Sequence, residues 1–358
     1  MNNDDKTRYG AARTALIRRL FPAGIPPLWC PALTHYQAQG VVDRARMRAH
    51  LNFMRPSVGG FLIPGSTGEG WEMSDAEART LLELMIDEVR DAGAHLLIGV
   101  LKRSTREVIA AIENTLRWLK RCTGCADGID SLRKSGVCGF TICAPTGAEL
   151  SQDEIRAALS SVLALDVPIA LYQLPQVTQN EIAPKTVESL AAEFPHFYLF
   201  KDTSGTDRVA AAGFRRAFMV RGAEGHYASH LRDGGGAYDG FLLSTANCFA
   251  RELRAMIEQV EAGQTVAAQD FTRRLSALCE ELFPAAGKIG YGNAFSNANK
   301  AIDHFMAHGP QAAMAIAPPM LHSGGRLPRE LLETARAALE RNGLMPQRGY
   351  LAGRWSAG

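Results

Sequence analysis

The chain has 358 residues, of which 46% are apolar and 21% charged, and its formal net charge is +2. This length allows one large α/β barrel or two domains of ordinary size. The small net charge, with no basic cluster interleaved with aromatic residues, excludes a typical nucleic-acid-binding surface. No apolar run approaches the roughly 20 residues that a membrane-spanning helix needs.

Residues 1–23 do not have the pattern of a secretory signal, and we expect an N-terminal extension with an amphipathic helix that packs on the domain. The seven cysteines are an odd number scattered through strand-like and helix-like segments. This usage favours a reducing compartment and therefore a cytoplasmic protein. Cys122 and Cys125 form a CxxC pair, but a zinc site would require a second close pair, so we expect no metal.

Apolar runs of strand length alternate with helical patterns along most of the chain. The runs are Ile25–Leu33, Gly60–Pro64, His95–Leu101, Gly139–Ala144, Pro168–Leu174, Phe197–Lys201, Phe218–Gly222 and Gly240–Ser244. Their continuous apolarity is typical of strands that are buried on both faces. Three of the helices begin with a Ser-x-x-Glu capping box, at Ser74, Ser104 and Ser151, and Pro184 suits the first turn of another. The alternation predicts a TIM (β/α)8 barrel over residues 24–262.

Residues 263–342 contain three further helical patterns, which we interpret as a C-terminal helical extension: Thr265–Leu282, Asn297–Ala307 and Pro328–Arg341. The segment Cys122–Val137 is longer than the usual connection between a helix and the next strand, and we expect it to be a surface insertion. Residues 343–358 are rich in Gly, Pro and Arg, which predicts a loosely held tail.

The sixth apolar run ends on Lys201, followed by Asp202 and Thr203. Strand residues alternate between faces, so Lys201 and Asp202 should point to opposite sides. Desolvation at the end of an apolar strand lowers the pKa of a lysine, and the neutral amine is the form that attacks a carbonyl. The alternative interpretation is a lysine whose ammonium group reaches solvent at the strand end.

The active site of a TIM barrel lies at the carboxyl ends of the strands. The second run is followed by Gly65–Gly70, where glycines, adjacent N–H groups and the hydroxyls of Ser66 and Thr67 can form a small anion site. This segment is neither a Walker loop nor a dinucleotide fingerprint. The fifth run carries Tyr172 near its end. Three strand ends therefore offer an amine, a phenol and an anion site.

These strand ends resemble those of the dihydrodipicolinate synthase and N-acetylneuraminate lyase family of class I pyruvate-dependent aldolases. The resemblance is carried by Gly-Ser-Thr-Gly-Glu at residues 65–69, by Tyr172-x-x-Pro175 and by Lys201-Asp202. It extends over roughly residues 24–262, and the appended helices also fit the family.

The resemblance implies a role for each matching residue. Lys201 would form a Schiff base with pyruvate or a related 2-oxo acid, and Thr67, with the N–H groups of Ser66 and Thr67, would hold the carboxylate. Tyr172 would shuttle protons, with Ser66 as its hydrogen-bonding partner, and a cationic iminium nearby would lower the pKa of the phenol. Leu242, on the eighth strand, would contact the substrate.

The sequence departs from the family pattern at two places. The family usually carries a tyrosine after the fourth strand, where Thr146 and Gly147 stand in this chain. The true dihydrodipicolinate synthases have an arginine at the position of Val177 for the carboxylate of the second substrate, which argues against that activity here. Glu224 and Ser244 fall where the sialic-acid lyase branch contacts polyol hydroxyls, but we interpret them as ordinary loop residues.

We therefore predict a cytoplasmic Schiff-base lyase that uses no cofactor or metal and acts on a small-molecule 2-oxo acid. We expect a homodimer or homotetramer with no nucleic-acid or membrane partner. Two alternatives stay open: a 2-oxo sugar acid dehydratase that uses the same lysine, and a catalytically silent family member that binds a 2-oxo acid.

Overall fold

The structure is a computed structural model of the chain, and it describes residues 8–352. Residues 1–7 of the predicted N-terminal extension and residues 353–358 of the predicted tail lie outside the described residues. Within the described part, no helix is long and apolar enough to cross a lipid bilayer.

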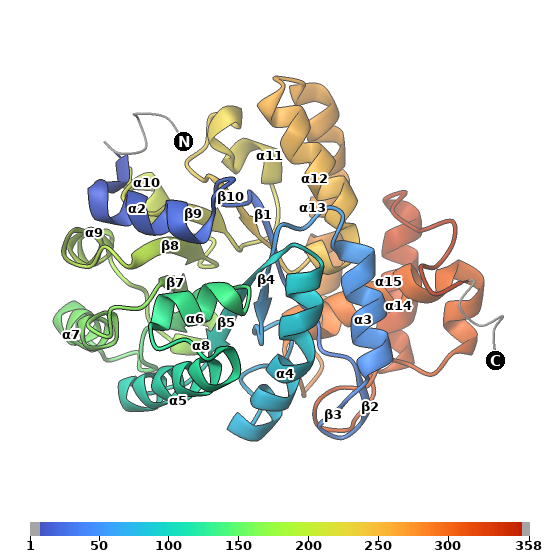
Figure 1. Cartoon of the computed structure of the whole chain (residues 1–358). Coiled ribbons are helices and arrows are strands. Elements are labelled where there is room, and N and C mark those ends of the chain that lie inside the picture. The colour runs from blue at the N-terminus through green and yellow to red at the C-terminus, as the bar shows by residue number, and fades with distance from the viewer. Residues whose placement is uncertain (1–7, 353–358) are drawn as a thin grey trace.

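Eight parallel strands form a closed barrel, in which β1 pairs with both the second and the last strand (Figure 1). The strands are β1 (Leu28–Pro31), β4 (Gly60–Ile63), β5 (His95–Val100), β6 (Val137–Cys143), β7 (Ile169–Gln173), β8 (Phe197–Asp202), β9 (Phe218–Arg221) and β10 (Gly240–Leu242). All eight predicted strands are present, and their ends lie within three residues of the predicted ends. The predicted TIM barrel is confirmed.

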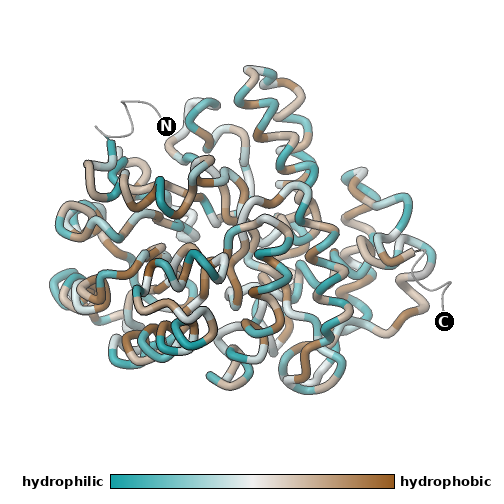
Figure 2. Tube along the Cα trace, in the orientation of Figure 1, coloured by the Kyte–Doolittle hydropathy of each residue, from teal (hydrophilic) through white to brown (hydrophobic). Residues whose placement is uncertain are grey.

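The strands are buried on both faces, as their continuous apolarity predicts. Each of the eight strands contributes at least one side chain to a single cluster that fills the barrel interior, and Trp29, Leu97 and Leu199 are examples. A second, larger cluster lies between the strands and the surrounding helices. Figure 2 shows the corresponding pattern on the outer helices, where hydrophilic and hydrophobic residues alternate along each turn.

A helix follows each barrel strand. These helices are α3 (Arg44–Met54), α4 (Asp75–Asp91), α5 (Thr105–Thr123), α7 (Gln152–Leu163), α9 (Pro184–Glu193), α10 (Arg208–Ala211), α11 (Tyr227–His230) and α12 (Ala246–Glu261). The three predicted capping boxes are all formed, at the starts of α4, α5 and α7. Pro184 occupies the first turn of α9, as predicted.

The N-terminal helix α2 (Ala11–Leu20) packs against the barrel, which confirms the predicted packing. Its Leu16, Ile17 and Leu20 belong to the same apolar cluster as the barrel interior. Phe21, which follows the helix, lies 4.6 Å from His95 and 5.7 Å from Tyr198 between ring centres. His95 is the first residue of β5, and Tyr198 follows Phe197, the first residue of β8. Helix α2 and Phe21 therefore cover the amino end of the barrel, and the carboxyl end is left for the site.

The C-terminal extension consists of α13 (Thr265–Gly287), α14 (Ala294–Ala312) and α15 (Arg329–Arg341), which pack beside α3 and α12 (Figure 1). Helix α13 continues through Pro284 beyond its predicted end, and α14 starts earlier than predicted because Asn293 caps it. The remaining short elements are β2 (Tyr36–Ala38), β3 (Val41–Val42), α6 (Gly128–Lys134), α8 (Pro175–Thr178), η1 (Arg232–Gly234) and η2 (Ala313–Ala315).

Two expectations about surface segments were wrong. The segment Cys122–Val137 is not a simple surface insertion, because it contains α6, whose Leu132 is fully buried. The tail is not loosely held over its described part. The N–H groups of Tyr350 and Leu351 donate to the carbonyl oxygens of Met306 and Ala307, at 2.9 Å each. The partly buried Tyr350 ring also stacks on Phe53, with 4.5 Å between ring centres, and holds a segment of otherwise flexible composition in place.

Candidate active site

Lys201 lies at the carboxyl end of β8 and is only 4% exposed. Its Nζ lies 3.9 Å from the centre of the Tyr172 ring, which belongs to the neighbouring strand β7. Burial lowers the pKa of Lys201 to about 7, and Cys143, Glu224 and Cys30 oppose this shift. The amine is therefore largely neutral at slightly alkaline pH, which a carbonyl-attacking nucleophile requires. The ammonium group of Lys201 does not reach solvent.

Asp202 points to the other side of the strand, as predicted, and accepts hydrogen bonds from the N–H and hydroxyl of Ser204. On the Lys201 side, Gly222 follows the end of β9, and no side chain fits at this position. A Cβ on Gly222 would lie 2.4 Å from Thr203 Oγ1 and 2.7 Å from Lys201 Cε. The glycine therefore keeps the space beside the amine open.

Tyr172 is 2% exposed, and burial raises the pKa of its phenol above the ordinary value. The nearby Thr203 and Ser66 hydroxyls oppose this rise in the pKa of Tyr172. The free protein therefore holds Tyr172 as a protonated phenol beside a largely neutral amine.

The segment Gly65–Gly70 is a tight turn after β4. The N–H groups of Gly68 and Gly70 donate to the Gly65 carbonyl at 3.0 Å, and that of Glu69 donates to the Ser66 carbonyl at 3.0 Å. Among residues 8–352, the N–H groups of Ser66 and Thr67 find no protein acceptor. Two adjacent free N–H groups and the Thr67 hydroxyl can bind one carboxylate.

The C-terminal extension holds this turn in place. Asn293 Nδ2 donates to the Ser66 carbonyl oxygen at 3.1 Å, and the N–H of His322 donates to Glu69 Oε1 at 2.9 Å. Lys300 on α14 forms a buried ion pair with Glu69 Oε2 and also donates to the Met320 carbonyl at 2.9 Å. Glu69 has a left-handed backbone, with φ of 61°, so these contacts stabilise a conformation that an isolated turn would avoid.

Trp71 and Val177 cover the phenol. Both pack, partly exposed, against the buried group formed by Cys143, Tyr172 and Leu174. Trp71 Nε1 donates a hydrogen bond to Ser66 Oγ at 2.9 Å. Reasoning from the sequence did not single out Trp71, although an aromatic ring directly after the glycine-rich turn was a usable signal.

The segment after β6 contributes no phenol to the site. The Thr146 N–H donates to Arg103 O at 3.1 Å, and the Gly147 N–H donates to Thr178 O at 2.9 Å. Gly147 has a φ of 157°, and a Cβ there would lie 2.7 Å from Glu149 Oε1. A larger side chain at residue 147 would therefore be strained. The hydrogen-bond partner of Ser66 in this chain is Trp71 instead.

The remaining predicted residues lie at the ends of β9 and β10. The Leu242 side chain is 1% exposed and belongs to the barrel interior. Its carbonyl oxygen lies beside Gly222, 3.3 Å from the place that a Cβ on this glycine would take. Its contact with substrate stays a prediction. Glu224 accepts hydrogen bonds from Ser244 Oγ at 2.6 Å and from Thr245 Oγ1 at 2.7 Å. These contacts hold Glu224 beside the start of α12. The interpretation of Glu224 and Ser244 as ordinary loop residues stays a prediction.

Comparison with known proteins agrees with this geometry. A model of the Dihydrodipicolinate synthetase family matches residues 123–297, which include Tyr172 and Lys201. The 4-hydroxy-tetrahydrodipicolinate synthase 1 of Streptomyces coelicolor is 27% identical over 293 residues, which are 80% of this chain and 83% of that protein. The chain is similar to members of the dihydrodipicolinate synthase family over most of its length. The resemblance inferred from the three strand ends is confirmed.

Two further similarities extend this comparison. The N-acetylneuraminate lyase of Enterobacter sp. strain 638 is 25% identical over 264 residues, which are 72% of this chain and 80% of that enzyme. The crystal structure of dihydrodipicolinate synthase from Aquifex aeolicus has a TM-score of 0.68 at 17% identity, and covers 90% of this chain and 100% of that one. The latter similarity shows the fold. The two named relatives carry out different reactions, so the family supports a lyase but leaves the substrate open.

One group of side chains has the composition of a metal site. Ligand atoms of His35, His50 and Asp303 lie within 4.8 Å of one another. His50 Nε2 bonds the Asn247 carbonyl at 2.8 Å, so this nitrogen carries the proton, and His50 Nδ1 accepts from His35 Nε2 at 3.0 Å. Asp303 is paired with Arg46 at 2.5 Å. Both of these Nε2 atoms are occupied by protons, so the group fits a buried hydrogen-bond network better than a metal centre.

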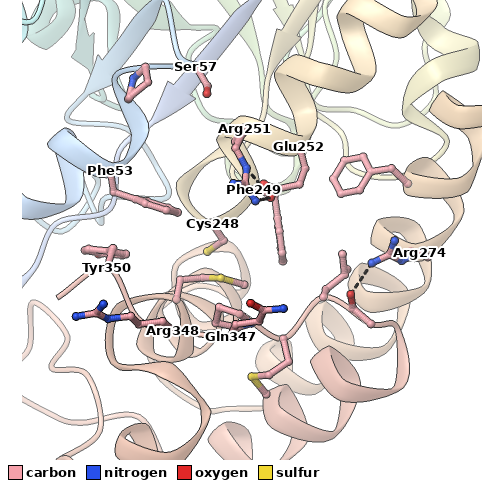
Figure 3. Close-up of a pocket in the computed structure, with 17 residues that line it drawn as sticks. Phe53, Ser57, Cys248, Phe249, Arg251, Glu252, Arg274, Gln347, Arg348 and Tyr350 are labelled. Carbon is pink, nitrogen blue, oxygen red and sulfur yellow. Dashed lines mark hydrogen bonds and ion pairs between the residues drawn. The ribbon is translucent and has the colours of Figure 1, made fainter. Parts of the chain in front are cut away.

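A wide cavity of about 740 Å³ lies away from Lys201, between α3, α12 and the C-terminal segment (Figure 3). Its walls include Phe53, Phe249 and Tyr350, which surround it in Figure 3. None of the predicted site residues lines this cavity. The predicted site residues and this cavity therefore belong to different parts of the molecule.

The lowered pKa of Lys201 predicts a particular pH dependence for imine formation. With a pKa of about 7, the neutral fraction rises about tenfold between pH 6 and pH 8 and then levels off. A lysine of ordinary pKa would give a rise of about a hundredfold over the same interval, with no plateau. The measurement is the initial rate of borohydride trapping with subsaturating pyruvate. A rate that continues to climb to pH 10 would contradict the assigned environment of Lys201.

Proposed function

We propose that the chain is a Schiff-base lyase that acts on pyruvate or a related 2-oxo acid. The observation that carries the proposal is a buried lysine of lowered pKa, in contact with a buried tyrosine. The free N–H groups of Ser66 and Thr67 also support the proposal. A 2-oxo acid has a carboxylate directly beside its keto carbon, and these N–H groups can bind it.

The reaction begins with attack of the neutral Lys201 amine on the keto carbon of the substrate. The resulting carbinolamine loses water and becomes a cationic iminium. The iminium accepts the electron pair of the carbon–carbon bond that breaks, so the aldehyde leaves and an enamine remains. Protonation of the enamine at carbon, followed by hydrolysis, releases pyruvate and restores the free amine.

Tyr172 is the acid and base in these steps. Its phenol can protonate the departing hydroxyl of the carbinolamine and later accept the proton from the hydroxyl of the cleaving substrate. The iminium cation that forms beside the ring lowers the pKa of the phenol at the stage when it must give up a proton. Ser66 and Thr67 keep the carboxylate in place while this exchange occurs.

The rim of the site limits which second substrate fits. Trp71 and Val177 are the partly exposed residues that pack over Tyr172, and neither can pair with an anion. We infer an aldehyde partner that carries no carboxylate at this edge of the site. A polyhydroxylated aldehyde is consistent with the rim, because its hydroxyls can form hydrogen bonds with backbone groups and water.

This rim predicts little or no condensation of pyruvate with aspartate semialdehyde. A carboxylate beside Val177 would lose the bidentate contact that an arginine provides and would keep a desolvation cost. The test compares initial rates with aspartate semialdehyde and with neutral aldehydes at equal concentrations. Efficient condensation with aspartate semialdehyde, as fast as with any other aldehyde, would contradict the prediction.

The experiment that tests the function is incubation with a panel of 2-oxo sugar acids, with the products identified by mass spectrometry and by enzymatic assay of pyruvate. A lyase releases pyruvate and an aldehyde. A dehydratase that uses the same lysine releases water and leaves a dideoxy 2-oxo acid of unbroken carbon chain. Trapping of pyruvate without turnover of any substrate would show a silent binding protein and would contradict the lyase.

We further propose that the protein is cytoplasmic and forms a homodimer or homotetramer. Free thiols at all seven cysteines support a reducing compartment. Measurement of mass in solution by light scattering tests the oligomeric state, and a monomer would contradict it.

A further inference from the structure

The Ser66 hydroxyl has two neighbours in the site, and one of them is outside the resemblance described above. Trp71 Nε1 donates a hydrogen bond to Ser66 Oγ at 2.9 Å. The Ser66 hydroxyl is also near enough to the Tyr172 phenol to oppose the rise of its pKa. Ser66 is 7% exposed, so these two contacts occupy a hydroxyl that has little access to water. Trp71 at the rim of the site is therefore bonded to a hydroxyl that neighbours the phenol.

The chemistry of the indole fixes the polarity of these contacts. An indole N–H is a donor and has no lone pair to accept with, whereas a hydroxyl can donate one proton and accept two. Trp71 therefore donates to Ser66, and the proton of Ser66 remains available for the oxygen of Tyr172. A proton cannot pass outward through Trp71, because the indole cannot accept one.

The ring also covers these contacts. Trp71 packs, together with Val177, against Cys143, Tyr172 and Leu174. Trp71 and Tyr172 belong to the same chain, so no residue of a second subunit is needed to cover the phenol. Burial of the phenol and a closed outer end both keep protons from exchanging with solvent during the reaction.

We propose that Trp71 is a positioning residue, which orients the Ser66 hydroxyl toward Tyr172 and closes the outer end of the proton path within one subunit. The proposal rests on the proposed function, because it assigns the role through the proton transfers of Tyr172. The consequence is that Tyr172 returns its proton to the bound substrate. It does not exchange that proton with bulk water between the two steps.

The first test is a double-mutant cycle on the rate of borohydride trapping with saturating pyruvate. Trp71→Phe removes the N–H and keeps an aromatic ring, and we expect trapping to slow about tenfold, the worth of one well-placed hydrogen bond. The dissociation constant of pyruvate should stay within about twofold, since the carboxylate contacts remain. In a Ser66→Ala background, Trp71→Phe should slow trapping by less than about twofold, because Trp71 acts through Ser66.

Trp118→Phe is the matched control. Trp118 is also half-buried, it contacts Arg79 on the outside of the barrel, and its replacement should leave trapping unchanged. Trp71→Phe overturns the proposal if it traps pyruvate as fast as the parent. An equal slowing in the parent and in the Ser66→Ala background also overturns it, because Trp71 would then act by packing alone.

A second measurement does not depend on activity. In protein labelled with 15N-tryptophan, the Trp71 indole resonance, assigned from its loss in Trp71→Phe, should exchange slowly with solvent and shift in Ser66→Ala. An indole signal that is unchanged by Ser66→Ala would overturn the proposal. A parent that traps no 2-oxo acid while its indole signal responds to Ser66→Ala would contradict the proposed function and leave the Trp71 contact established.

Discussion

Replacement of Lys201 by arginine is expected to lower turnover of every 2-oxo acid substrate by on the order of a thousandfold or more. A guanidinium stays charged at any working pH and cannot form an imine, so the electron sink of the reaction is lost. Lys201 is buried, at 4% exposure. The measurement is the steady-state rate of pyruvate release.

Arginine is larger than lysine and could strain the barrel end, so Lys201→Met serves as a second variant of similar length. It should fold at least as stably as the parent, because it removes a buried amine. Lys185→Arg, at an exposed position on α9, is the matched control and should keep parental turnover. Substantial pyruvate release by both Lys201 variants would exclude Lys201 as the nucleophile.

Replacement of Lys300 by methionine is expected to destabilise the protein by about 3 kcal/mol and to weaken pyruvate binding. The Lys300 and Glu69 side chains are 0% and 2% exposed, so the methionine variant leaves a buried carboxylate without its cation. Burial lowers the pKa of Lys300, and Glu69 opposes that shift by stabilising the ammonium. Because Glu69 closes the turn that carries Ser66 and Thr67, its movement should disturb the carboxylate site.

The measurements are the free energy of unfolding in urea and the dissociation constant of pyruvate. Lys288→Met, at an exposed position after α13, is the matched control and should change neither quantity. The double variant Lys300→Met with Glu69→Gln should recover part of the stability, since no charge is then left buried. Equal unfolding midpoints for Lys300→Met and the parent would contradict the structural role of this pair.

The barrel was predictable from the sequence because its signals are local. Continuous apolar runs mark doubly buried strands, and each Ser-x-x-Glu box marks a helix start within four residues. All eight strands and all three boxes are present. The strand order of a TIM barrel then follows from right-handed crossover connections, with no further information needed.

The site was predictable in part for the same reason. Lys201, Tyr172 and Ser66 each stand at a strand end, and the closed barrel brings strand ends together. What supports them was not predictable. Lys300 is 231 residues from Glu69 along the chain, and the docking of Tyr350 joins the described tail to α3 and α14. Contacts of this kind depend on the packing of a complete helical extension against the barrel.

The hydrogen bond that Ser66 accepts from Trp71 could not be predicted from the sequence either. Trp71 is five residues from Ser66, but only the shape of the turn brings its N–H onto the hydroxyl. The turn has this shape because Glu69 holds a left-handed backbone with the help of Lys300 and His322. A buried lysine in α14 thus influences a tryptophan at the rim of the site.

Lys201 is the residue that we propose to form the covalent bond to the substrate, and every step of the proposed reaction requires it. The most direct measurement is borohydride reduction in the presence of pyruvate, followed by intact mass and peptide mapping. We predict one reduced pyruvate per chain, attached to the peptide that contains Lys201, and no adduct in Lys201→Arg. An adduct on another lysine, or labelling that persists in Lys201→Arg, would contradict the account.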